Sequence, residues 1–175
     1  ELSHVIQELF ALNDLDRGIT VNVGTIDGGL RPNVVAPRSE AVVDVRVATA
    51  ADAERIEAAI RGLKPAIAGT SIEVEGLFGR PAMEHTPANR KLWRLACQLG
   101  SDLGIDLEEG AAGGGSDGNF TSLYTATLDG MGAVGDGAHA RHEHLRLTPT
   151  IERSALLALL LMAPPLQKTS RAEKP

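Results

Sequence analysis

The stretch EAVVDVRVATAADAERIEAAIRGL, residues 40–63, decides the fold of the first half of the chain. Its first part alternates between apolar and polar side chains, which is typical of a strand with one buried face. The apolar positions of that face are Val43, Val45 and Val47. From Thr49 onward the spacing of apolar residues becomes that of a helix, and Thr49 is its predicted N-cap. A strand leading directly into a helix is therefore expected here.

The residues on either side extend this pattern. Apolar spacing predicts an amphipathic helix over residues 2–10, and alternation predicts strands over 19–26 and 70–78. The resulting order is helix, strand, strand, helix, strand. With one more strand in front it would be the split unit of ferredoxin-like folds. Because the chain opens at Glu1 inside a helix, we expect it to be a piece of a longer protein.

A second domain is predicted from the change of pattern near residue 80. Thr86 and Pro87 are typical of a helix start, and the apolar spacing continues to about residue 103. Short strands are expected near 105–109 and 125–135, a short helix near 116, and a last helix over 148–162. This is part of an α/β layer fold. The expected domains are residues 1–79 and 80–164, followed by a disordered tail over 165–175.

The composition limits the possible partners and surroundings. The chain has 175 residues, of which 43% are hydrophobic and 23% charged, and its net charge is −6. An acidic chain argues against nucleic-acid binding, which needs a basic face. No apolar run reaches the roughly 20 residues that span a bilayer, so no membrane partner is expected. The single cysteine, Cys97, fits a reducing compartment, and we expect a cytoplasmic protein.

A glycine-rich stretch, GAAGGGSDGN, lies between a predicted strand and a predicted helix start. Exposed backbone amides at such a place bind anions such as phosphate or carboxylate. The stretch matches neither the P-loop pattern nor GxGxxG. The alternative is a flexible tight turn in which Asp117 caps the helix.

Two polar residues of the first half, Asn33 and Arg46, could hold a carboxylate. A guanidinium fork and an amide are suited to this task. Arg46 shares its strand face with Asp44, however, so an exposed ion pair is the alternative. Arg80 lies at the predicted domain junction, where ligands often bind, but it could equally be a solvated linker residue.

Three of the five histidines lie in GDGAHARHEHL, residues 135–145. Their spacing does not select one member, and three such close neighbours rarely bind one ion. A single histidine ligand oriented by a nearby carboxylate is the more sensible arrangement.

Taken in order, the motifs NVVAPRSEAVVDVRV, GRPAMEHT, GGGSDGNF and GAHARHEHL resemble the M20 family of zinc peptidases and deacylases. The most similar subgroup contains glutamate carboxypeptidases and the acetylornithine and succinyl-diaminopimelate deacylases. The resemblance implies a ferredoxin-like lid that lacks its first strand and also forms a homodimer. The C-terminal α-β-α-β-α part of the catalytic domain would follow it.

The resemblance also implies roles for individual residues. His139 would be a zinc ligand and Glu143 the carboxylate that orients it. The substrate, a small peptide or N-acyl amino acid, would be bound by a set of residues from both halves: Asn33, Arg46, Arg80, Gly114, Gly115 and Ser116. Two Zn²⁺ ions, or other divalent metals, would activate the water that attacks an amide carbonyl.

The remaining zinc ligands and the general-base glutamate of the family are expected upstream of Glu1, so no catalytic residue is assigned within this chain. A zinc site needs three or four protein ligands. The chain alone is therefore expected to be inactive. The alternative is a non-catalytic dimerisation or small-ligand module of ferredoxin-like type.

Overall fold

The computed structural model describes residues 1–76 and 78–165. Its contacts divide the chain into two compact units, one formed by Glu1–Glu84 and one that begins at His85.

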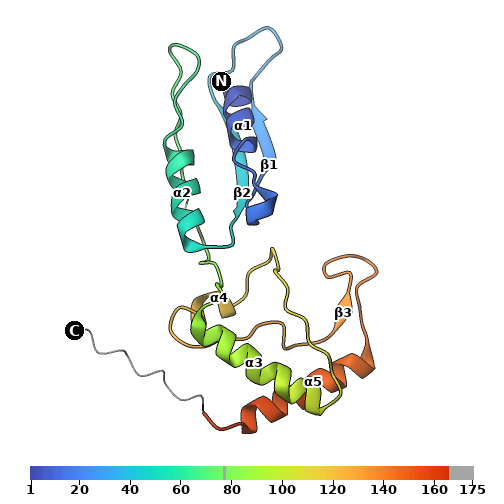
Figure 1. Ribbon diagram of the computed structural model, residues 1–175. Coiled ribbons are helices and arrows are strands. Elements are labelled where there is room, and N and C mark those ends of the chain that lie inside the picture. The colour runs from blue at the N-terminus through green and yellow to red at the C-terminus, as the bar shows by residue number, and fades with distance from the viewer. Residues whose placement is uncertain (77, 166–175) are drawn as a thin grey trace, which may run out of the picture. The chain divides into compact units, whose positions relative to one another are not determined.

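A long antiparallel hairpin is the centre of the first unit (Figure 1). Strand β1 (Thr20–Gly28) pairs with β2 (Ser39–Arg46), and the register shifts at a bulge between Val23 and Thr25. Val43 and Val45 of β2 are half-buried while Val42, Asp44 and Arg46 are exposed, as the alternation predicts. Both predicted strands are confirmed.

Two helices accompany the hairpin. Helix α1 (Leu2–Phe10) contacts both strands and buries Leu9. Helix α2 (Ala50–Arg61) begins as predicted at Thr49, whose hydroxyl accepts a hydrogen bond from the Asp52 amide at 3.0 Å. Ile56 of α2 is completely buried. The capping and apolar patterns therefore located both helices correctly.

A buried carboxylate joins α2 to the turn before β1. Asp52 is 3% exposed and accepts a hydrogen bond from Arg17 at 2.6 Å. Arg17 ends the short 3-10 helix η1 (Leu15–Arg17). The hydroxyl of Thr49, together with the charge of Arg17, lowers the pKa of Asp52 below its ordinary value. The carboxylate is thus held ionised where it links two segments of the unit.

The strand predicted over residues 70–78 does not form over its described residues, 70–76 and 78. Its alternation survives, because Ile72 and Val74 are half-buried between exposed neighbours. An extended segment becomes a strand only when a neighbouring strand pairs with its backbone, and β1 and β2 pair only with each other. Side chains hold the segment instead: Arg61 donates to the carbonyl of Gly76 at 2.8 Å.

The side chain of Glu1 fixes the loop after α2. Its carboxylate accepts hydrogen bonds from the amides of Ala66 at 3.0 Å and Ile67 at 2.8 Å, and from the hydroxyl of Thr70 at 2.9 Å. The bonds from the two backbone amides lower the pKa of Glu1 from 4.5 to about 2. The negative charge is therefore part of what orders this loop.

We expect this loop to loosen in acid. Because the pKa of Glu1 is lowered on folding, its contribution is complete above pH 4.5 and is lost as the pH falls toward about 2. The NMR shifts of the Ala66 and Ile67 amides should change together over this interval. In the Glu1→Gln variant, which has no carboxylate to titrate, they should stay constant. Wild-type shifts that do not change over this interval would contradict the assignment.

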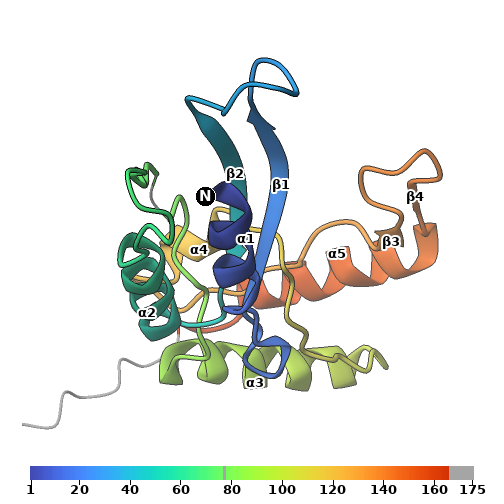
Figure 2. The same ribbon diagram turned by 90° about the horizontal axis from the view of Figure 1, so that it is seen from above.

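Two long helices that contact each other are the main elements of the second unit (Figure 2). Helix α3 (Pro87–Asp102) begins after Thr86, whose hydroxyl accepts the amide of Asn89 at 3.0 Å. Helix α5 (Leu147–Met162) packs against α3, and the core here includes Leu156 and Ala96. Both helices were predicted from the sequence.

The remaining elements of this unit are short. A single turn, α4 (Gly118–Thr121), follows the glycine-rich stretch. Strands β3 (Gly135–Asp136) and β4 (His144–Leu145) form a two-residue antiparallel pair.

The strand predictions for residues 105–109 and 125–134 are wrong, and only residue 135 of the second one enters β3. Within the described residues, neither segment has a neighbouring strand with which to pair. The second is instead held by Asn89, whose side-chain oxygen accepts the amide of Thr127 at 2.9 Å. Among the described residues, no helix has the length and apolar character needed to cross a membrane. The tail predicted to be disordered lies, apart from residue 165, outside the described part.

Candidate functional site

The histidine-rich stretch forms the hairpin loop between β3 and β4. His139 lies in this loop with a positive φ of 67°. Its amide donates a hydrogen bond to the carboxylate of Glu143 at 3.3 Å. The structure therefore brings together the predicted ligand and its predicted partner, and Glu143 binds the backbone of His139. Both side chains are exposed.

These residues do not fit a complete zinc centre. No group of three or more His, Cys, Asp or Glu side chains that could hold a metal ion occurs in the described parts of the chain. One imidazole supplies one ligand of the three or four that zinc requires. A centre built on His139 would need further ligands from outside residues 1–76 and 78–165.

The glycine-rich stretch is organised around Ser116. Its hydroxyl donates to Asp129 at 2.6 Å and accepts the amide of Gly118 at 3.0 Å. Its own amide donates to the side-chain oxygen of Asn119 at 2.7 Å. The polar groups of Ser116 thus hold the turn and the start of α4. Gly114 and Gly115 are exposed just before it.

The alternative proposed for this turn also needs one correction. Asp117 precedes α4, but its side chain makes no capping hydrogen bond. Ser116 binds the Gly118 amide instead. A serine two residues before the amide offers a suitable acceptor, as in the local turns that Ser and Thr form.

Arg46 forms an ion pair with Asp44 on the exposed face of β2. The distance from Nε of Arg46 to the Asp44 carboxylate is 2.8 Å, and each side chain is 53% exposed. A pair this open to water contributes little to stability. A carboxylate ligand would therefore meet little resistance in drawing the guanidinium away from Asp44.

Asn33 and Arg46 are not brought together within the chain. Arg46 pairs with Thr20 at one end of the hairpin, whereas Asn33 lies in the loop beyond the opposite end, where Gly28 pairs with Ser39. The seven steps from residue 39 to residue 46 span about 23 Å at roughly 3.3 Å per residue. One small carboxylate cannot touch both residues in a single copy. Arg80 is exposed near the end of the first unit.

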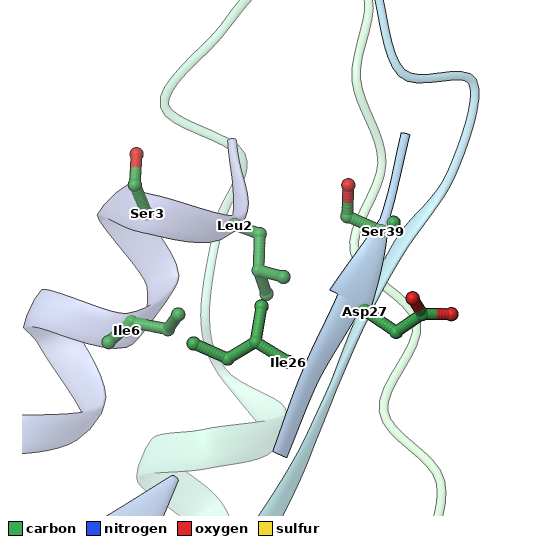
Figure 3. Close-up of a pocket in the computed structure, with 7 residues that line it drawn as sticks. Leu2, Ser3, Ile6, Ile26, Asp27 and Ser39 are labelled. Carbon is green, nitrogen blue, oxygen red and sulfur yellow. The ribbon is translucent and has the colours of Figure 1, made fainter. Parts of the chain in front are cut away.

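A separate open pocket lies between α1 and the far end of the hairpin (Figure 3). Leu2 and Ile26 point toward each other across it, while the carboxylate of Asp27 points away from them. None of the predicted site residues lines this pocket. Its lining residues are Leu2, Ser3, Ile6, Ile26, Asp27, Gly28 and Ser39.

Two carboxylates that accept hydrogen bonds in the structure were not singled out from the sequence. Asp129 anchors Ser116, and Glu84 accepts the first amide of α2, that of Ala50, at 2.7 Å. The partners lie 13 and 34 residues away along the chain. The only local signal was the dipeptide of Asp129 and Gly130, which is typical of a turn.

Comparison with known families gives a match within the first unit. Residues 1–66 match the model of the peptidase dimerisation domain of M20 proteins. This match supports membership of the M20 family. It covers α1, both strands of the hairpin and α2, and it supports formation of a homodimer. No curated protein matches the chain significantly.

Proposed function

We propose that the chain is part of a hydrolase that cleaves an amide bond next to a substrate carboxylate. The observation that carries the proposal is the match of residues 1–66 to the peptidase dimerisation domain. The ordered motifs that follow, through GAHARHEHL, support the same family. In this proposal, residues 1–79 are the lid and residues 80–164 belong to the catalytic domain.

The substrates proposed are small peptides or N-acyl amino acids, so that the enzyme is a carboxypeptidase or a deacylase. Zinc is the proposed cofactor, as two ions, with His139 as one ligand. Because the described residues do not complete a zinc centre, no catalytic step is assigned to the metal here. A cytoplasmic location belongs to the same proposal.

Arg46 is the residue proposed to bind the substrate carboxylate. Its guanidinium is about half exposed, and its partner Asp44 lies on the same open face of β2. Planar guanidinium groups suit bidentate binding of carboxylates. Asn33 lies at the other end of the hairpin, about 23 Å away at roughly 3.3 Å per residue, so it would contact a small ligand bound to Arg46 only from a second copy of the chain. Arg80, Gly114, Gly115 and Ser116 remain proposed substrate contacts.

The Arg46→Ala variant tests this proposal in the protein expressed from the complete gene. We expect KM for an N-acyl amino acid to rise about tenfold or more, because a hydrogen bond to a charged group is lost. For the methyl ester of the same substrate, which has no carboxylate, the rise in KM should be much smaller. The Asp44→Ala variant is the matched control, because it breaks the same ion pair and keeps the guanidinium.

An unchanged KM in Arg46→Ala would leave the ion pair as the only role of this arginine. Absence of hydrolysis of any N-acyl amino acid or dipeptide by the wild-type protein would favour the second candidate, a non-catalytic dimerisation or small-ligand module. The Asp44–Arg46 pair is the observation that favours this second candidate, because it engages the guanidinium without a ligand.

A further inference from the structure

The backbone of His139 has an unusual conformation. Among the residues that the structure describes, His139 is the one non-glycine residue with a positive φ, at 67°. A side chain in this left-handed region is unfavourable, because Cβ approaches the following carbonyl oxygen. Such a conformation persists only where the surrounding residues hold it, and it is found preferentially at functional sites.

Hydrogen bonds within the loop provide part of that support. The amide of Ala140 donates to the carbonyl of Gly137 at 2.8 Å, and the amide of Glu143 donates to the carbonyl of Ala140 at 3.1 Å. These two turns bring the side chain of Glu143 back toward residue 139. Its carboxylate then accepts the His139 amide at 3.3 Å. The amide of the left-handed residue therefore has a specific acceptor.

Close packing provides the rest. A side chain added at Gly137 would place Cβ only 2.7 Å from the ring of His142, so the imidazole of His142 lies against this glycine. At Gly135, an added Cβ would collide with the carbonyl oxygen of His144. Both glycines therefore allow the two arms of the hairpin to approach closely. The loop that contains His139 is therefore held by close packing at Gly135 and Gly137 and by its own hydrogen bonds.

We propose that Glu143 is a positioning residue that acts on the backbone of His139 and not on its imidazole. By holding the amide, it keeps His139 in the left-handed conformation and so fixes the direction in which the imidazole leaves the loop. The inference rests on the proposed function only in taking His139 as the functional residue. The bond requires an oxygen acceptor at the right reach, and it does not require a negative charge.

This distinguishes two ways in which Glu143 could act. A carboxylate bonded to the imidazole would increase the basicity of the ring, and a neutral glutamine could not replace that effect. An acceptor for the backbone amide can be replaced by glutamine, because its side-chain oxygen accepts the same bond at the same reach. The Glu143→Gln and Glu143→Ala variants therefore separate the two modes.

The experiment measures hydrogen exchange of the His139 amide by NMR in the metal-free chain. In Glu143→Ala the exchange should accelerate about tenfold, because the amide loses its acceptor, whereas Glu143→Gln should stay within about threefold of wild type. Exchange that is unchanged in Glu143→Ala would overturn the proposal. So would exchange in Glu143→Gln as fast as in Glu143→Ala, because charge would then be essential.

The control is Glu152→Ala, which removes an exposed glutamate from α5. It should leave exchange of the His139 amide unchanged. Acceleration equal to that of Glu143→Ala would overturn the proposal, since loss of a glutamate outside the loop would then have the same effect. Because the measurement is made without metal, a protein that binds no zinc would contradict the proposed function and leave this result intact.

Discussion

Replacing His139 with alanine is expected to lower the affinity of the protein for zinc by more than about a hundredfold. Residues that merely support a metal ligand change affinity by roughly 10–100-fold when they are mutated, and removal of a ligand itself should cost more. The activity expected for the wild-type enzyme should fall with the zinc content. Metal analysis of the protein expressed from its complete gene, together with kcat for an N-acyl amino acid, would measure both effects.

His144→Ala is the matched control for this change. His144 is an exposed histidine of the same hairpin, and its ring nitrogen lies 3.1 Å from the carbonyl oxygen of His142. It should therefore keep wild-type zinc content and kcat. Near-normal zinc in the His139→Ala variant would remove His139 from the ligand set. Loss of zinc in His144→Ala alone would move the assignment to that residue.

Local signals in the sequence were sufficient for the helices and for the first hairpin. Thr49 and Thr86 each bind the amide three residues ahead, as their spacing predicts. Such caps involve residues within one turn, so a single stretch of sequence contains all that is needed. The alternation of β2 likewise predicted which of its residues face the core, because one buried face imposes a period of two.

The predicted strands that failed had the same kind of local signal. Ile105 and Leu107 are half-buried between exposed neighbours, and Ile72 and Val74 show the same pattern. Alternation indicates an extended segment with one covered face. It does not show whether another strand lies alongside, which depends on residues far away in the sequence. The sequence therefore predicted correctly which side chains are covered. It could not predict whether the backbone pairs with another strand.

Only part of the candidate site could be predicted from the sequence. The sequence motifs placed His139 and Glu143 near each other, and four residues is short enough for that to follow locally. They did not show that Glu143 reaches the amide, because this depends on the positive φ of His139. Nor could they place Asn33 and Arg46 at opposite ends of the hairpin. Motif order identifies candidate residues, whereas their separation depends on the register of the strands.

Leu156→Ala is expected to destabilise the second unit by about 2–5 kcal/mol, the usual cost of truncating a fully buried leucine. Leu156 is 0% exposed on α5, and Ala96 of α3 is 1% exposed. The loss combines the burial of the missing methyl groups with the cavity that remains between packed elements. Urea unfolding, followed by near-ultraviolet absorbance of Trp93 in α3, would measure it.

Leu161→Ala, on the same helix, is the matched control. Leu161 is 79% exposed, and its truncation should change the free energy of unfolding by no more than about 0.5 kcal/mol. The comparison matters because α5 is apolar on more than one side: Leu147, Ile151 and Met162 are also between 68% and 74% exposed. A loss for Leu161→Ala as large as for Leu156→Ala would mean that this outer face is covered in solution. Only a difference between the two leucines supports α3 as the contact that stabilises α5.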